Sequence, residues 1–483
     1  MIIFEDEREF QYFASMTNLF SMLDENLSPT VWLIGIKNDK GKDRTVIFPK
    51  GTDYKLSRFK DIRAKTKHLQ DKSNSSPKRA KILCLRDALE MEIRKDDTQR
   101  SLISFCSLPV LVNEYHVSVV LQLQRDIFFS HDHLDIDKNI TSRLATSLID
   151  ATVLECLEIY TKELSKPVPR KGFMFAERPP DEIMRAAGRR LMYTPIARLD
   201  ADIAWHYQLY SLCNAISAMK YEGASGDGGI LVAVEDHPDV KVDIHLSNPI
   251  PIYNYRSDGD YRSVRKLLEM CSDKLRLLCN GNHIYGLGRE KRTYDPRDES
   301  LFLVRFLAPF SWELLHDEHR LMQVVHDLPK LPETRIEKSE FVEKLCKVFP
   351  NLGTTHSDRL WALVEAAIEQ KHGTMVVILD DAKDEAERLK NQATIVKPFP
   401  LTGAVMKDVT AIDGAVLIDM KATCYAIGAI LDGVASDKGT PARGARYNSA
   451  IRYVDEKPKC IAIVISEDGM VNLIHKDTEY DTA

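Results

Sequence analysis

The 483-residue chain has no uninterrupted apolar run near the ~18 residues that a membrane-spanning helix requires. Its N-terminus, MIIFEDEREF, turns acidic at once and lacks the basic and apolar regions of a secretory signal, which predicts a cytoplasmic location and no membrane partner. The chain also has only a small excess of charge of one sign. Because 66 basic residues stand against 72 acidic ones, the formal net charge is −6, and the molecule as a whole does not attract nucleic acid.

Cysteine pairs of the kind that hold small secreted or zinc-binding domains are absent as well. The nine cysteines are an odd, scattered set without a CxxC pair, so we expect buried thiols in place of disulfides or a zinc ribbon. Two groups of histidines lie near carboxylates but match no zinc-binding spacing, and we interpret them as surface or core residues. These are His131 and His133, and His316, His319 and His326.

The composition is that of a globular protein of several domains. Hydrophobic residues make up 44% and charged residues 29%. At roughly 100–200 residues per domain, the length indicates about two to four domains. Proline-bearing breaks at 166–180 and 328–333 divide the chain. We predict an α/β fold in three parts, residues 1–165, 166–332 and 333–483.

The first two parts read as mixed α/β domains. Residues 31–36 and 117–123 are apolar runs typical of strands, and residues 140–164 have helical periodicity. In the middle part we expect, among other elements, a helix over 261–278. We interpret residues 1–332 as a sensory or regulatory region.

A basic stretch runs from Lys55 to Lys81 in the first part. We interpret it as a solvated loop. Contact with nucleic acid or another polyanion is the alternative, and the stretch has few of the aromatic residues that such contacts use.

Residues 333–483 are strongly periodic. Helices are expected at 339–349, 358–370 and 382–392 and from about Gly444. Strands are expected at 375–379, 412–418, 423–431, 460–466 and 471–474. This order predicts a mixed β-sheet flanked by helices.

Two short motifs in this last part have complementary chemistry. Asp413-Gly414-Ala415 stands where a strand begins, so its carboxylate, beside a residue without a side chain, can hold a divalent cation and approach a sugar hydroxyl. Arg443-Gly444-Ala445-Arg446 stands where a helix begins, so its backbone N–H groups and arginines can bind phosphate oxygens. Taken singly, the first motif is a common turn and the second a common helix start. Together they are what nucleotidyl transfer needs.

The motifs and their order resemble the nucleotide-binding domain of the diadenylate cyclases, the DisA-type family. The resemblance covers about residues 335–480 and rests on HGTMVVIL (372–379), IDGAVLID (412–419), GARYNSA (444–450) and IVISEDG (463–469). It implies that two ATP molecules condense into cyclic di-AMP and two pyrophosphates with Mg²⁺ or Mn²⁺. It also implies a divergent branch of the family, in which this domain follows a long sensor region.

The resemblance further implies roles for individual residues. Asp413 and Arg446 would be catalytic, and Asp413 and Glu467 would face the metal ion. Because the product is two-fold symmetric, two subunits would meet head to head in a homo-oligomer. ATP would be held by Gly414, Ala415, Arg443, Gly444, Ala445, Tyr447, Asn448 and Ser449.

This chain departs from the family's basic motif at three positions. Ala445, Tyr447 and Asn448 stand where the family has Thr, His and a second Arg, so a hydroxyl, an imidazole and a permanent charge are missing. Two alternatives therefore stay open. One is a cyclase that uses a different nucleotide, and the other is a non-catalytic ATP-binding sensor module.

Overall fold

The first sheet explains why residues 31–36 are apolar without a break. Successive side chains of a strand point to opposite faces, and both faces are covered here. Val31 and Leu33 pack in one core, whereas Trp32 and Ile34 pack in another. The sheet is antiparallel, with the order β2-β1-β5-β3 and with β4 paired to β5. Its strands are β1 (Thr30–Asp39), β2 (Lys42–Phe48), β3 (Leu102–Cys106), β4 (Val110–Val112) and β5 (Tyr115–Gln124).

Helices cover the two faces of this sheet. One face packs against α2 and α3, and the other against η1 and α6. Part of the positive charge of the basic stretch Lys55–Lys81 is neutralised by ion pairs. Arg58 and Lys65 pair with Glu92, and Arg58 also pairs with Asp96. The elements are η1 (Ser15–Met22), η2 (Leu56–Phe59), α2 (Ile62–Gln70), α3 (Pro77–Arg94), α4 (Asp97–Arg100), α5 (Arg125–Phe129) and α6 (Leu148–Leu164).

An eight-stranded sheet follows, in the order β13-β12-β11-β10-β6-β8-β9-β7. The helix predicted over 261–278 is wrong beyond Leu268, because β8 pairs with β6 and β9 there and this long-range pairing overrides the local periodicity. The strands are β6 (Gly228–Val232), β7 (Val240–Pro251), β8 (Arg276–Cys279), β9 (His283–Glu290), β10 (Phe302–Ala308), β11 (Ser311–His316), β12 (His319–Val325) and β13 (Leu328–Lys330).

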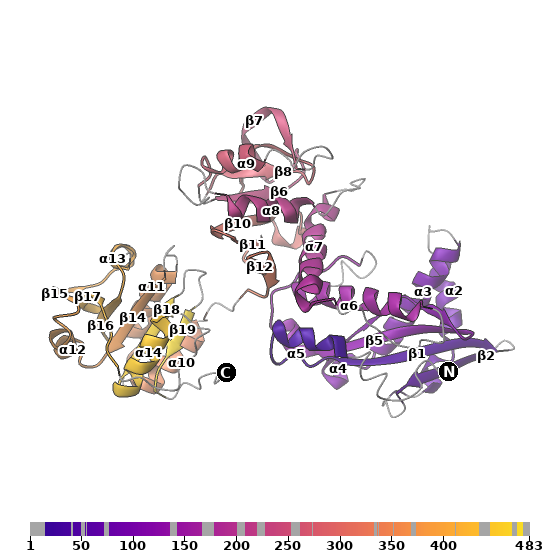
Figure 1. Cartoon of the computed structure of the whole chain (residues 1–483), viewed down its shortest axis with the longest axis horizontal. Helices are drawn as coiled ribbons and strands as arrows, with labels where there is room; N and C mark the ends of the chain where they lie inside the picture. Colours follow the sequence, from indigo (N-terminus) through magenta and orange to yellow (C-terminus); the bar gives the residue numbers. More distant parts are fainter. Residues whose placement is uncertain are drawn as a thin grey trace. The chain divides into compact units, whose positions relative to one another are not determined.

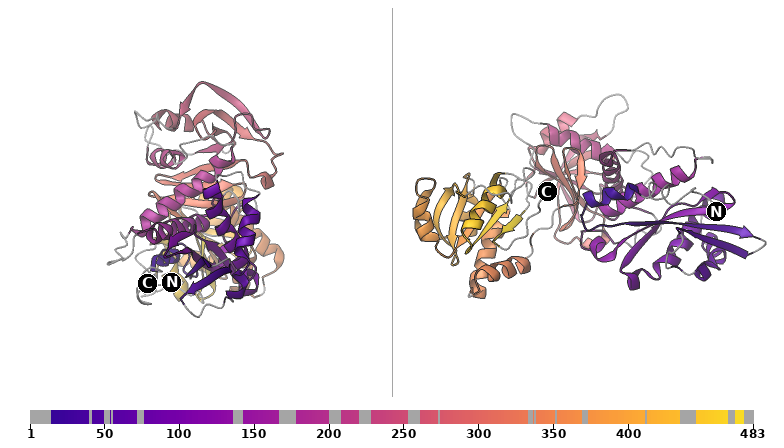
Figure 2. Two further views of the ribbon diagram at one scale, coloured as in Figure 1. Left: turned by 90° about the vertical axis from the view of Figure 1, so that its right-hand side faces the viewer. Right: turned by 60° about the horizontal axis from the view of Figure 1, so that its bottom comes forward.

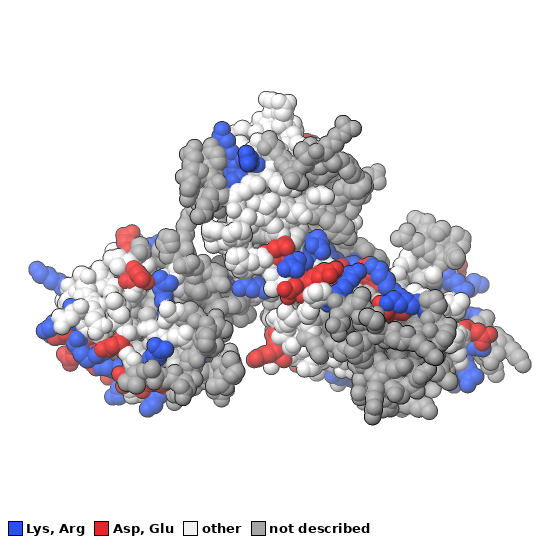
Figure 3. All heavy atoms as spheres, viewed as in Figure 1, with Lys and Arg blue, Asp and Glu red and all other residues white. Residues whose placement is uncertain are grey.

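The helices around the second sheet also connect it to the first. Arg190 of α7 forms ion pairs with Glu155 and Glu158 of α6, and acidic and basic side chains alternate along this face (Figure 3). Gly188 of α7 packs so closely on Pro329 that a Cβ would lie 2.4 Å from the proline Cγ. These elements are α7 (Pro180–Arg198), α8 (Gln208–Ala218), α9 (Tyr261–Leu268) and η4 (Pro296–Asp298).

The last sheet is six-stranded and mixed, in the order β15-β17-β16-β14-β18-β19. β14 and β16 are parallel, and their other neighbours are antiparallel. Helices α10, α11 and α13 share a core with one face, and α12 and α14 with the other (Figures 1 and 2). The elements are α10 (Lys338–Val348), α11 (Thr354–Ile368), β14 (Thr374–Leu379), α12 (Ala382–Arg388), β15 (Thr394–Pro400), α13 (Gly403–Val409), β16 (Ala415–Asp419), β17 (Thr423–Ala429), α14 (Ala445–Glu456), β18 (Cys460–Ile465) and β19 (Val471–Ile474).

The chain divides into two compact units, Met1–Pro332 and Glu333–Ala483, called here the N-terminal and C-terminal units. The boundary expected at residue 165 falls inside the first unit and stays a prediction. No helix within the described ranges has both the length and the hydropathy that a membrane crossing needs. The computed structural model describes residues 15–476 except 40–41, 50–53, 55, 72–76, 136–142, 167–177, 200–207, 220–227, 253–260, 273, 333–335, 337, 351, 369–372, 411, 434–444 and 466–470.

A buried carboxylate joins α12, α14 and the segment after β17. Glu385 of α12 is 1% exposed. It accepts a hydrogen bond of 2.7 Å from Tyr453 of α14 and lies 2.6 Å from the ammonium of Lys457, which directly follows α14. Arg388 bonds to Glu385 and, at 2.8 Å, to Asp432. Burial alone would raise the pKa of Glu385, but the hydrogen bonds from its three partners outweigh burial and lower that pKa below its ordinary value of 4.5.

We expect Glu385→Gln to lower the free energy of unfolding at neutral pH by roughly 2 kcal/mol or more, because Arg388 and Lys457 lose their shared anion. The folded-state pKa is lowered, so this stabilisation is present above the unfolded-state pKa and is lost as the pH falls through the folded-state pKa. Urea unfolding followed by circular dichroism from about pH 7 to about pH 3 checks this. An equal pH dependence in the wild type and Glu385→Gln would contradict it.

Candidate functional site

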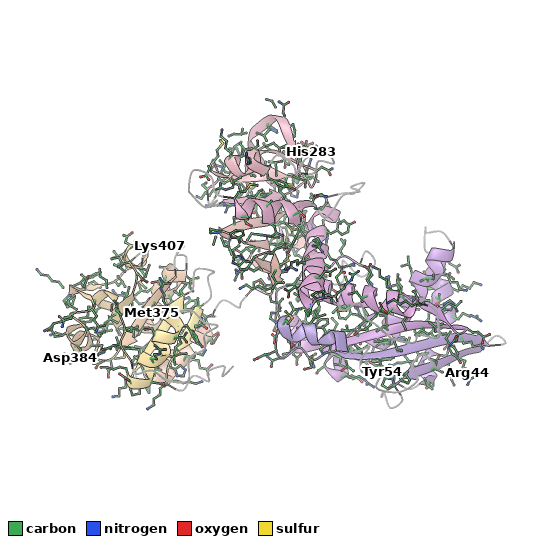
Figure 4. The ribbon with its side chains drawn as sticks, in the orientation of Figure 1. Arg44, Tyr54, His283, Met375, Asp384 and Lys407 are labelled. Carbon is green, nitrogen blue, oxygen red and sulfur yellow. The ribbon has the colours of Figure 1, made fainter. Side chains whose placement is uncertain are left out.

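One edge of the C-terminal sheet gathers the beginnings of its parallel strands. Met375, near the start of β14 and labelled in Figure 4, pairs with Ala415 of β16, and Ala415 in turn pairs with Ala429 of β17. Asp413 and Gly414 directly precede β16. The first predicted motif therefore lies at this edge, beside the end of β17.

Two glycines bring the backbones of this edge into contact. Gly414 has φ +110°, and a Cβ there would lie 2.6 Å from the carbonyl carbon of Gly428, which itself has φ +62°. Neither position accepts a larger residue without strain. Gly428 was not among the predicted site residues. Its signal in the sequence was a glycine inside a strand pattern, which often marks a close backbone approach.

The two predicted motifs meet at this edge. The Nη2 atom of Arg446 donates to Oδ1 of Asp413 at 2.8 Å, although 33 positions separate the two residues. The backbone N–H of Gly414 donates to the same oxygen at 3.1 Å. The Asp413 side chain is 89% exposed, so the ion pair is worth at most about 1 kcal/mol and can exchange for a ligand at little cost.

Both partners keep polar atoms available beyond this contact. Nε of Arg446 is buried and has no hydrogen-bond partner among the described residues. The second carboxylate oxygen of Asp413 accepts no hydrogen bond from any described residue. The Arg446 side chain as a whole is 35% exposed, so its guanidinium can donate to an anionic oxygen next to a carboxylate oxygen that can hold a cation.

The other predicted ATP-binding residues that the structure describes differ in burial and in their contacts. Ala415 is fully buried in the sheet, so only its backbone is left for a ligand. The hydroxyl of Ser449 donates to the carbonyl of Leu431 at 3.4 Å, which connects α14 to the segment after β17. Tyr447 packs against the core on that face, Ala445 is exposed and Asn448 is half-buried. Arg443, Gly444 and Glu467 lie outside the described residues, and their roles stay predictions.

The segment after β17 rests directly on α14. A Cβ at Gly433 would lie 2.8 Å from the carbonyl carbon of Arg452, so only glycine allows this approach. The neighbouring Asp432 is held by Arg388. The helix that carries Arg446 is thus positioned from both α12 and the end of β17.

The structure also shows where the histidines and cysteines lie. His131 is 2.9 Å from Asp24 and His319 is 3.0 Å from Asp132, and His316 is buried beside Tyr294. No three His, Cys, Asp or Glu side chains converge on a metal position in the part of the chain that is described. The cysteines are free and seven of them are buried. The expectation of buried thiols is wrong for Cys346, which is exposed.

Comparison of the sequence with protein-family models identifies the domain that contains this edge. Residues 362–478 match the model described as DisA bacterial checkpoint controller nucleotide-binding. The C-terminal unit is a DisA-type nucleotide-binding domain. Residues 4–192 match a probable sensor domain, DACNG, and residues 207–318 match a probable sensor domain, DACNH. The DisA-type domain therefore follows two sensor domains in this chain.

Two solved structures are similar to this chain at low identity. A hypothetical membrane spanning protein from Bacillus cereus is 19% identical, with a TM-score of 0.24, over 29% of this chain and 69% of that chain. A double mutant of DacA from Staphylococcus aureus is 17% identical, with a TM-score of 0.22, over 30% of this chain and 91% of that chain. The search of curated proteins gives no match.

We expect Gly414→Ala in the DisA-type domain to lower the free energy of unfolding by roughly 2–4 kcal/mol, because the new methyl group meets the Gly428 backbone at a positive φ. Gly353→Ala is the matched control. The nearest atom to its Cβ would be 3.9 Å away, and we expect a change within about 0.5 kcal/mol. Urea unfolding of both variants checks this, and equal stabilities would show that the close approach is not needed.

Proposed function

We propose that the C-terminal unit condenses two ATP molecules into cyclic di-AMP and releases two pyrophosphates. The observation that supports this most is the 2.8 Å contact between Asp413 and Arg446. It joins a carboxylate and a guanidinium from two separate motifs at the glycine-lined edge of a DisA-type domain. A nucleotidyl transfer site needs this combination, because a hydroxyl must be activated next to a stabilised phosphate.

The reaction has two equivalent halves. In each half the 3′-oxygen of one ATP bonds to the α-phosphorus of the other, and the bond from that phosphorus to the oxygen bridging to the β-phosphate breaks. Asp413 accepts the hydroxyl proton, and pyrophosphate leaves with the bridging oxygen. Arg446 donates hydrogen bonds to the phosphate oxygens, where negative charge develops. The second half closes the ring.

Mg²⁺ or Mn²⁺ is part of this proposal. The unbonded carboxylate oxygen of Asp413 is a ligand of the type that hard divalent cations prefer, and Glu467 is the second predicted ligand. Magnesium is commonly held by one or two carboxylates together with substrate phosphates, so a site with few protein ligands fits it. When bound, the ion neutralises charge on the triphosphate.

Two copies of the chain have to take part. Each C-terminal unit contributes one Asp413 and one Arg446, whereas the product contains two equivalent phosphodiester bonds. We propose a head-to-head pair in which each copy presents its ATP to the other. The two sensor domains would regulate this pairing or the access of ATP.

The altered basic motif supports a second candidate function. Tyr447 and Asn448 replace two side chains that carry or accept a proton in the family motif, so the domain would hold a nucleotide as a sensor without turnover. Binding of ATP to a folded preparation without release of pyrophosphate distinguishes this candidate from the cyclase. A product built from another nucleotide would identify a cyclase of different specificity.

We expect the full-length protein to form cyclic di-AMP from ATP and Mn²⁺, and chelation of the metal to stop it. Asp413→Asn and Arg446→Met are each expected to lower the rate by about 100-fold or more, because each removes a charge that acts at the reacting groups. Mass spectrometry of the nucleotides and a pyrophosphate assay check both statements.

Arg452→Met is the matched control for the arginine variant. Arg452 lies on the same helix and is exposed, so the same loss of charge leaves the proposed site intact. We expect near wild-type rates for it. If Asp413→Asn turns over ATP like the wild type in a folded preparation, the proposed reaction does not occur at this edge.

A further inference from the structure

The opposite edge of the same sheet carries a cavity that the proposed reaction does not use. Asp380 follows β14, and Met420 and Lys421 follow β16, and all three line a cavity of about 350 Å³. This is the carboxyl end of the two parallel strands, where open α/β sheets commonly bind ligands. Asp413 lies at the other end of β16. The cavity is therefore separate from the candidate nucleotide site.

One wall of the cavity is apolar. Val348 at the end of α10 lines the cavity together with Phe349, Pro350 and Leu352, which lie between α10 and α11, and with the half-buried Met420. Phe349 is 5% exposed and belongs to the core under this face, so the wall is part of the folded domain. A volume of this size lies at the lower end of the range for small-molecule pockets. It suits a compact body such as an aromatic ring.

The rim of the cavity is cationic. The ammonium groups of Lys421 and Lys459 have no ion-pair or hydrogen-bond partner among the described residues, and neither does the ring of His356. Asp380 is the acidic residue among those that line the cavity. With neutral histidine the lining carries one more positive than negative charge, which favours an anion next to the apolar wall.

The turn between β16 and β17 holds one of these lysines in place. One carboxylate oxygen of Asp419 accepts the backbone N–H groups of Lys421 and Thr423, both at 2.8 Å. Ala422 between them has φ +62°, a left-handed conformation that the turn imposes. The backbone position of Lys421 is thus set before any ligand binds, which lowers the entropic cost of binding.

We propose that this cavity binds a small organic anion, with a carboxylate or phosphate head on a compact aromatic or aliphatic body. The head pairs with Lys421 and Lys459, and the body packs on Phe349 and Met420. The proposal does not depend on the proposed reaction, because no lining residue belongs to the Asp413 edge.

Benzoate and phenyl phosphate are suitable probes, and benzyl alcohol is the neutral control of the same shape. Titration of the full-length protein, followed by ligand-observed NMR, is expected to show saturable binding of the two anions and weaker binding of the alcohol. The stronger anion identifies the head group. Benzyl alcohol binding as tightly as both anions, or no saturable binding of either anion, would overturn the proposal.

The double variant Lys421→Met, Lys459→Met removes both charges and keeps side chains of similar length. We expect it to weaken anion binding by about tenfold or more and to change alcohol binding by less than about twofold. Lys383→Met, Lys397→Met is the matched control, with two exposed lysines of the same unit outside the cavity. An equal loss of anion affinity in both double variants would show a nonspecific charge effect and overturn the proposal.

Two further variants keep the test independent of these lysines and of the nucleotide site. Met420→Glu places a carboxylate in the wall, and in a preparation with wild-type circular dichroism we expect it to abolish anion binding. Unchanged binding in that variant would contradict the proposal. Arg446→Met is expected to leave anion binding unchanged, and a loss there would place the anions at the other edge.

Discussion

The contact between the Gly414 and Gly428 backbones is the constraint on which the candidate site depends. The contact lets the start of β16 lie against β17 without intervening side chains. The side chain of Asp413, just before β16, is exposed to solvent. A side chain at either glycine would push the two strands apart. The segment that follows β17 contacts α14, the helix that carries Arg446. The position of Arg446 therefore depends on the packing of β17 as well.

The site residues themselves contribute little to the stability of the fold. The Asp413–Arg446 ion pair is exposed and weak, whereas the buried Glu385 binds Tyr453 on the helix that carries Arg446 and Lys457 directly after that helix. This division is physically useful. The ion pair that a ligand would displace in the proposed reaction is weak, whereas the carboxylate that joins the helices is buried and hydrogen-bonded.

The two edges of the C-terminal sheet differ in chemistry. At the beginning of β16, a carboxylate, a guanidinium and exposed backbone suit a phosphate ester and a cation. At its end, an apolar wall with a lysine rim suits an anion with an apolar body. Only the five residues Ala415–Asp419 separate the two edges, and four of them are buried on both faces.

Sequence patterns were sufficient for most of the C-terminal elements, because its central strands are apolar throughout and its helices have regular periodicity. Sequence patterns did not predict β15, an exposed edge strand with two prolines. In the N-terminal unit they did not predict β8, whose pairing with β6 is long-range. The Asp413 and Arg446 motifs were found from residue type, order and resemblance to a known family, whereas the role of Gly428 was not.

The sequence by itself determined which chemical groups this domain carries and that they belong to two motifs of a known family. Only the tertiary structure decided that Asp413 and Arg446 meet, since their contact spans 33 positions and depends on how β16, β17 and α14 pack. It also decided that the lysine-rimmed cavity lies at the opposite edge. The end of α10, the residues after β14 and β16 and the residue before β18 converge there only after the sheet has formed. Local patterns contain no information on such distances, which are set by strand pairing and by the burial of both sheet faces.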